Sequence, residues 1–155
     1  MSNDVAKVFV AGPFSQARDE SGTVKGEVRR RLASILGHLR VNGVEAFSAH
    51  EREEWGAAID APESLVAIDL SALRAASCLI AYLGSVPSLG TSIEIGVAIG
   101  LKKRVLILRD SETVVVSDFY QGLVAIGQLE ERLWRDDKEL ELAILAFVRG
   151  SGYLS

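Results

Sequence analysis

The sequence predicts an α/β protein with three layers, in which a five-stranded parallel sheet is covered by helices on both faces. Two observations predict this fold. Short apolar segments that suit buried strands alternate along the chain with longer segments whose apolar residues recur at helical spacing. Two of the strand-like segments also end in glycine-containing turns, which suits the carboxyl edge of a parallel sheet. The 155 residues are expected to form one domain, residues 1–155.

The first strand is predicted over Val5–Ala11, and Gly12-Pro13-Phe14 ends it abruptly. Phe14 lies just outside the strand, so it either fills the core or offers a flat surface to a ligand; the sequence leaves both open. The segment Val24–Val41 carries apolar residues at helical spacing, and Asn42-Gly43 stops it. Val44–Phe47 is then a brief second strand.

The segment Ser48–Gly56 is rich in groups that bind polar, flat molecules. A charged amphipathic turn with Trp55 packed into the core has the same composition, and composition favours it. A helix follows, with Asp60 as its cap and Pro62 in the first turn, and runs to about Ala76. Asp69 lies in its middle, where an exposed side chain is the simpler interpretation and one facing a cleft is the alternative.

The third strand, Ser77–Leu83, leads into a glycine-rich turn and then a helix that ends near Gly100. We expect Thr91 to be the N-cap of this helix, with Glu94 three residues later. The pair is an ordinary capping box when taken alone. At the carboxyl end of a parallel strand, however, the free N–H groups of such a helix start favour an anion, and Glu94 would stand beside it.

The rest of the chain continues the alternation, with a fourth strand at Val105–Leu108, a fifth at Leu129–Trp134 and a closing helix at Asp136–Val148. Val114–Ile126 is ambiguous: it begins like a strand and continues like a short helix. Five strands favour the flavodoxin-like (Rossmann-like) order 2-1-3-4-5. Strands 1 and 3 are then neighbours, so the turns that follow them share one cleft.

Composition excludes several classes of function. The net charge of −4 gives no broad cationic surface, so we expect no nucleic-acid partner. The single Cys78 lies within an apolar run and is expected to be a buried, reduced thiol. Two histidines and one cysteine are too few for a typical zinc site, so no metal is expected. We see neither a secretory signal nor a membrane span, and we therefore expect a cytoplasmic protein.

A cleft with an anion site, carboxylates and an aromatic surface suits a nucleotide. Two carboxylates without a metal or cofactor can cleave a bond at an anomeric carbon through an oxocarbenium-like transition state. Acyl transfer is a poor competitor, because the chain shows neither a Cys–His nor a Ser–His–Asp arrangement.

Several of these residues together resemble the nucleoside 2-deoxyribosyltransferase superfamily. The resemblance rests on the segments Val8–Phe14 and Gly90–Gly96 and on Asp69, and it extends to Leu108. Within that group, His50–Gly56 and Pro87–Thr91 resemble the N-glycosidases that hydrolyse CMP or 5-hydroxymethyl-CMP in nucleoside-antibiotic and thiamine-antimetabolite pathways. They also resemble the deoxynucleoside 5′-monophosphate N-hydrolases.

This resemblance implies a role for each matching residue. Glu94 would attack C1′ to give a glycosyl-enzyme. Asp69 would contact the sugar, position Glu94 and assist protonation of the departing base. Phe14 would stack on the base. The remaining candidates are the phosphate-binding residues Ser88, Gly90 and Thr91, the residues Arg18, His50 and Arg52 near the base or phosphate, Gly12 in the turn after the first strand, and Ser117, which would reach a neighbouring subunit's phosphate site in a homodimer.

The resemblance therefore implies a pyrimidine nucleoside 5′-monophosphate as substrate, no cofactor, and hydrolysis to free base and ribose 5-phosphate. The alternatives are a deoxyribosyltransferase that exchanges bases, a deoxynucleotide hydrolase and a nucleotide sensor without turnover. Many relatives have an Ala-Asp pair at the start of the third strand, where this chain has Ala76-Ser77. We interpret this difference as a change in local support and not in the chemistry.

Overall fold

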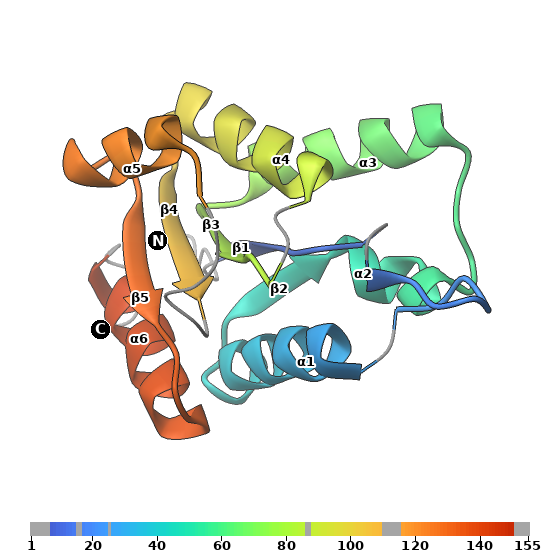
Figure 1. Ribbon diagram of the computed structural model, residues 1–155, viewed down its shortest axis with the longest axis horizontal. Helices are drawn as coiled ribbons and strands as arrows, with labels where there is room; N and C mark the ends of the chain where they lie inside the picture. Colours follow the sequence, from blue (N-terminus) through green and yellow to red (C-terminus); the bar gives the residue numbers. More distant parts are fainter. Residues whose placement is uncertain (1–6, 15–16, 25, 86–87, 110–115, 151–155) are drawn as a thin grey trace, which may run out of the picture.

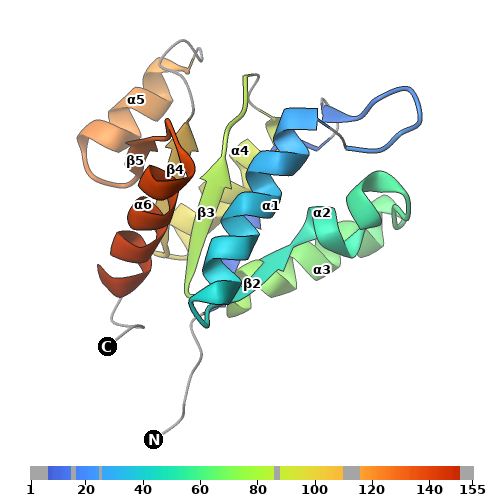
Figure 2. The ribbon, with the colours of Figure 1, turned by 90° about the horizontal axis from the view of Figure 1, so that it is seen from below.

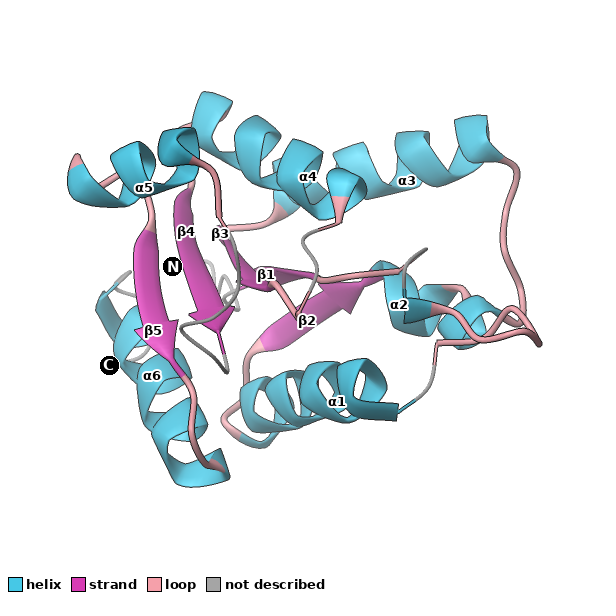
Figure 3. Ribbon diagram, viewed as in Figure 1, coloured by secondary structure: helices cyan, strands magenta, loops and turns pink. Residues whose placement is uncertain are grey.

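The computed structural model describes residues 7–14, 17–24, 26–85, 88–109 and 116–150. At its centre lies a five-stranded parallel sheet in the order β2-β1-β3-β4-β5, with helices on both faces (Figure 1, Figure 3). The predicted fold class and strand order are confirmed. The strands are β1 (Lys7–Ala11), β2 (Glu45–Ser48), β3 (Cys78–Tyr82), β4 (Arg104–Arg109) and β5 (Glu130–Leu133).

Helices occupy the connections between successive strands, as a parallel sheet requires, and a last helix follows β5. Within the ambiguous segment Val114–Ile126, the helical alternative holds from Asp118 onward, where a helix begins with Ser117 as its N-cap. The beginning of that segment, Val114 and Val115, lies outside the described residues. The helices are α1 (Gly26–Val41), α2 (Ala49–Arg52), the short 3-10 helix η2 (Glu54–Gly56), α3 (Pro62–Ala75), α4 (Leu89–Gly100), α5 (Asp118–Ala125) and α6 (Asp137–Gly150).

The core has two halves, one on each face of the sheet. On one face, α1 and α6 pack against side chains that include Val8 and Ile80 (Figure 2). On the other face, α3, α4 and α5 pack against neighbouring positions such as Phe9 and Leu79. Every residue of β3 is buried, because successive side chains alternate between two covered faces. This includes Cys78, whose predicted burial is confirmed; burial raises the pKa of its thiol to about 11.

Two predicted helix caps are wrong. Thr91 is not the N-cap of α4: the helix begins at Leu89, and the hydroxyl of Ser88 accepts from the backbone N–H of Thr91 at 3.5 Å. Asp60 is not the cap of α3 either, since Ala61 occupies that position without a side-chain hydrogen bond. The Asp60 carboxylate instead forms an ion pair with Arg52, and this pair draws its side chain away from the helix start.

The connection between α2 and α3 contains a strained turn. Glu54 and Trp55 have positive φ angles of 48° and 57°, which are uncommon for residues other than glycine. Gly56 follows with a φ of 99°, and a Cβ there would lie 2.5 Å from the carbonyl oxygen of Gly22. The Trp55 carbonyl accepts from the Val24 N–H at 2.6 Å, so this turn holds the loop that follows β1.

Candidate active site

A cavity of about 490 Å³ lies at the carboxyl end of β1, beside α2, α3 and the start of α4. This is the switch point of the sheet, where the chain leaves β1 and β3 in opposite directions and where open α/β sheets bind ligands. The cavity brings together eight of the residues expected from the sequence, which are Gly12, Phe14, His50, Asp69, Ser88, Gly90, Thr91 and Glu94.

Glu94 contributes a half-buried carboxyl from the second turn of α4. Burial, and after it the negative charge of Asp69, raises the pKa of Glu94 to about 8. At neutral pH the ligand-free protein therefore holds a proton on this group. A carboxyl whose pKa lies near the working pH can gain or lose a proton during a reaction cycle.

Asp69 lies on α3 and is 8% exposed, so the interpretation of an exposed mid-helix residue is wrong. Its pKa is raised, chiefly by burial, and the nearby Arg52 opposes that rise. One Nη atom of Arg52 lies 3.6 Å from Oδ1 of Asp69. The same guanidinium contacts Glu53 and Asp60. Arg52 thus binds carboxylates from three parts of the chain and restrains Asp69.

The start of α4 forms the opposite wall. Ser88, which is buried, caps the helix through its hydroxyl, while its carbonyl accepts from the N–H and the hydroxyl of Ser92 at 3.0 Å and 2.9 Å. The first N–H groups of a helix have no partner within it and carry the positive end of the helix dipole. Within the described residues, no lysine or arginine lines the cavity. The backbone N–H groups of Leu89 and Gly90 and the buried Thr91 hydroxyl, which has no hydrogen-bond partner, are available to an anion there.

Three rings stand side by side near α2, and two of them line the cavity. The ring centroid of His50 lies 5.1 Å from that of Phe14 and 5.9 Å from that of Trp55. Phe14 and His50 line the cavity, whereas Trp55 packs against the α1 side of the core. The expected core position of Trp55 is confirmed, and Phe14 is available to a flat ligand.

His50 is buried, and its Nε2 lies 2.9 Å from the carbonyl oxygen of Pro13. A carbonyl only accepts, so Nε2 carries the proton and donates it. Burial lowers the pKa of His50, which favours the neutral ring. Its Nδ1 is then an acceptor, and that atom is buried without a hydrogen-bond partner.

Gly12 and Gly90 serve different purposes. A Cβ on Gly12 would lie 2.8 Å from a methyl group of Leu32, so this glycine allows α1 to pack against the end of β1. A Cβ on Gly90 would meet only the Ser88 hydroxyl, at 3.7 Å. The space above Gly90 is therefore open to a ligand.

Three expected site residues do not line the cavity. Arg18 donates to the carbonyl of Gly22 at 2.6 Å and lies 6.0 Å from the ring centroid of Phe14, near the cavity but outside its wall. Arg52 lies behind Asp69. Ser117 caps α5 and belongs to a different cavity of the same chain.

Glu53 also lines the cavity, although the sequence did not single it out as a candidate site residue. It is 1% exposed and directly follows α2. Burial raises its pKa, and the positive charge of Arg52 opposes the rise. The signal was present in the sequence, because Glu53 follows His50 by three residues and residues at that spacing share a helix face.

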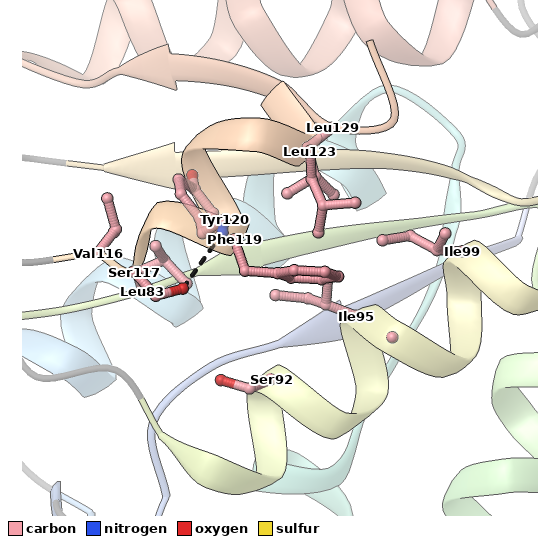
Figure 4. A pocket seen from close by; sticks show the side chains of 11 residues that line it. Leu83, Ser92, Ile95, Ile99, Val116, Ser117, Phe119, Tyr120, Leu123 and Leu129 are labelled. Atoms are coloured by element: carbon pink, nitrogen blue, oxygen red, sulfur yellow. Dashed lines mark hydrogen bonds between the residues drawn. The ribbon is translucent and has the colours of Figure 1, made fainter. Parts of the chain in front are cut away.

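A second cavity, of about 580 Å³, lies between α4 and α5 and is mostly apolar. Figure 4 shows Phe119 of α5 and Ile95 of α4 facing each other across it, with Ser117 at one end. Phe119 is 78% exposed. No carboxyl group lines this cavity in the described part of the chain, so the chemistry expected of Asp69 and Glu94 belongs to the first one.

The structure offers little to a metal ion. Within the described ranges, no group of three or more His, Cys, Asp or Glu side chains has the arrangement of a metal site. The helices described there are also too short or too polar to span a bilayer.

Residues 8–132 match the family described as nucleoside 2-deoxyribosyltransferase. The chain belongs to that family. Among solved structures, one titled "Solution Structure of BlsM" is similar with 29% identity and a TM-score of 0.75, covering 97% of this chain and 93% of the other. No curated protein sequence matches the chain.

More distant members of this fold include two named enzymes. The Clostridium botulinum CMP N-glycosidase BcmB is 21% identical, with a TM-score of 0.63 and coverage of 89% of this chain and 97% of that one. The 2-deoxyribosyltransferase from Bacillus psychrosaccharolyticus is 19% identical, with a TM-score of 0.66 and coverage of 92% and 96%. At these identities the likeness concerns the fold, and it agrees with the expected superfamily.

Proposed function

We propose that this protein hydrolyses the N-glycosidic bond of a pyrimidine nucleoside 5′-monophosphate of the CMP type, giving free base and ribose 5-phosphate. The observation that carries the proposal is the meeting, in one cavity, of two carboxyl groups with a helix start suited to a phosphate. Asp69 and Glu94 supply the carboxyls, and Ser88 and Gly90 mark the helix start. An aromatic ring, Phe14, stands in the same cavity for the base.

The reaction proceeds in two displacements. First, an oxygen of ionised Glu94 forms a bond to C1′ as the bond from C1′ to the base nitrogen breaks. The bond's electron pair leaves with the base, which takes up a proton delivered from solvent through Asp69, and Asp69 is then ionised again. Water then attacks C1′ and breaks the ester to Glu94. The carboxylate is restored, and the water's second proton passes to Asp69.

Burial of Glu94 has a cost and a benefit in this scheme. The raised pKa of Glu94, about 8, means that the nucleophile must lose its proton before it attacks. The same environment makes the carboxylate more reactive toward a cationic transition state, because charge interactions strengthen where water is excluded. The positively charged sugar of that transition state would also be stabilised by the ionised Asp69.

The start of α4 favours a phosphate-bearing substrate over a free nucleoside. Its unpaired N–H groups and the Ser88 hydroxyl form the kind of site that binds phosphate at helix N-termini. BcmB, a structural neighbour, is named a CMP N-glycosidase, which agrees with this choice. Membership of the transferase family favours base exchange as the second candidate, or hydrolysis of a deoxynucleotide.

The test is incubation with CMP, 5-hydroxymethyl-CMP, dCMP, cytidine and deoxycytidine, each with and without adenine, followed by chromatography of the bases and nucleosides. Release of free base from the monophosphates alone is the expected result. Adenine-dependent formation of deoxyadenosine would identify a transferase. Nucleotide binding without any product would identify a sensor. Glu51→Gln should behave as the wild type in this assay, because Glu51 does not line the cavity and pairs with Arg40.

We also propose that the protein is a homodimer that joins through α4 and α5. The apolar cavity between these helices and the exposed side chains Phe119 and Ile126 support this. Light scattering after size exclusion should give twice the chain mass. Phe119→Glu should shift the protein toward the monomer, and a wild-type monomer would contradict the proposal.

A further inference from the structure

The part of the cavity wall that α2 and the residue after it contribute carries two nearly fully buried polar side chains. His50 is 3% exposed and Glu53 is 1% exposed, and both line the cavity. They are three residues apart at α2, a spacing that places side chains on the same face of a helix. This part of the wall is distinct from the helix start that would hold a phosphate.

Both side chains offer hydrogen-bond acceptors. Nε2 of His50 is committed as a donor to the Pro13 carbonyl, so Nδ1 of the neutral ring carries a lone pair and has no partner. Oε1 of Glu53 accepts from Arg52 at 2.9 Å. Burial raises the pKa of Glu53, but the positive charge of Arg52 opposes that rise and favours the ionised carboxylate. Oε2 of this carboxylate is left for a further donor.

The cavity is therefore polarised. Backbone donors lie at the start of α4, and acceptors lie at α2. A buried acceptor that is left without a donor is destabilising, so this end favours a ligand that brings N–H groups. Phe14, whose ring lies 5.1 Å from that of His50, would hold a flat ring beside these acceptors.

We propose that Glu53 and His50 form a subsite for the exocyclic amino group of the base, and that this subsite selects an amino-pyrimidine over its keto counterpart. The inference rests on the proposed function, because it assumes that a nucleotide occupies the cavity. The 4-amino group of cytosine has two N–H donors, one for each acceptor. The 4-oxo group of uracil would instead place its lone pairs against those of Glu53 and His50.

Binding to a Glu94→Gln protein tests the inference without turnover. Calorimetry would compare CMP, UMP, N4-methyl-CMP and N4,N4-dimethyl-CMP. A site built to hydrogen-bond a donor rejects an analogue that lacks it, so we expect CMP to bind about a hundredfold more tightly than UMP. The monomethyl nucleotide should fall between them, and the dimethyl nucleotide should bind as weakly as UMP.

Glu53→Gln in the same background should lower the CMP to UMP affinity ratio at least about tenfold, because the amide offers a donor to the 4-oxo group. Glu51→Gln, on the outer face of α2 where it pairs with Arg40, should leave the ratio unchanged. Circular dichroism would show that each variant is folded. The methylated nucleotides need no variant of the subsite, so they test it even if Glu53→Gln does not fold.

Two contrary results are distinguishable. Equal affinity for CMP, UMP and the dimethyl nucleotide would overturn the amino subsite while leaving nucleotide hydrolysis intact. Failure of all these nucleotides to bind the Glu94→Gln protein, with no base released by the wild type, would overturn the proposed function and the subsite together.

Discussion

Asp69→Asn tests how two carboxyl groups of the cavity, those of Asp69 and Glu94, influence each other. The pKa of Glu94 is raised from 4.5 to about 8, with burial as the larger cause and the charge of Asp69 as the second. Removing that negative charge makes the Glu94 carboxylate easier to form. The pKa of Glu94 must therefore fall, while burial keeps it above its ordinary value.

The size of the fall follows from the order of the two causes. Because burial contributes more, Asp69 accounts for less than half of the rise, so the pKa should drop by less than half of it and stay above the ordinary value. The acid limb of the pH profile, where kcat/KM rises with pH, reports the pKa values of groups in the free enzyme. Activity that needs ionised Glu94 rises through this limb, which should move to lower pH in the variant.

The assay is the initial rate of cytosine release from CMP below KM, measured from pH 5 to pH 10 for the wild type and for Asp69→Asn. The phosphate of CMP itself titrates near pH 6, but it does so for both proteins and does not shift the comparison. Asp69→Asn should also be much slower, because the residue is expected to contact the sugar. A limb that stays in place or moves to higher pH would refute the coupling of Asp69 with Glu94.

Three further predictions follow from the same geometry. Ser88→Ala should raise KM for CMP about tenfold without changing KM for cytidine; equal changes for both substrates would contradict the phosphate role. The same variant should lose about 1 kcal/mol of unfolding free energy, because it loses the helix cap. Gly56→Ala should cost more than about 2 kcal/mol in a denaturant titration, because its φ is 99° and its Cβ would meet the backbone of Gly22; an unchanged midpoint would contradict it. Glu94→Gln should become progressively more stable than the wild type as pH rises from 4.5 toward 8, because folded Glu94 holds its proton up to about pH 8 and an unfolded glutamate does not. A constant difference in melting temperature across that range would show that Glu94 has an ordinary pKa.

The strands and their order could be predicted because the signals are local and consistent. β3 reads as an uninterrupted apolar run, and all five of its residues are buried. Alternation with amphipathic helices then restricts the topology to a few possibilities. The cavity could be predicted for the same reason, since a turn after β1 and a turn after β3 must meet at the switch point.

The caps and the environment of Asp69 were harder to predict. Ser88 and Thr91 both carry hydroxyls and lie three residues apart, so propensity alone does not decide which one begins α4. The burial of Asp69 depends on which face of α3 meets the cavity wall and on the position of Arg52, which comes from another part of the chain. Neither is a local property of the sequence around Asp69.

The turn at η2 shows the limit of pattern reasoning most clearly. Glu54 and Trp55 adopt positive φ angles that no local propensity favours, and tertiary contacts stabilise them. Trp55 packs against the core and accepts a hydrogen bond from Val24. This turn fixes the end of α2, and with it the position of Glu53.

The central claim is that Glu94 attacks the anomeric carbon of a nucleotide. The most direct test is mass spectrometry of the protein after incubation with 2′-deoxy-2′-fluoro-CMP, whose fluorine slows both displacements by destabilising the oxocarbenium-like transition states. We predict a mass increase of one fluorinated sugar phosphate, located by peptide mapping on Glu94 and absent from Glu94→Gln. An unmodified Glu94, together with a Glu94→Gln protein that still releases cytosine from CMP at the wild-type rate, would contradict the claim.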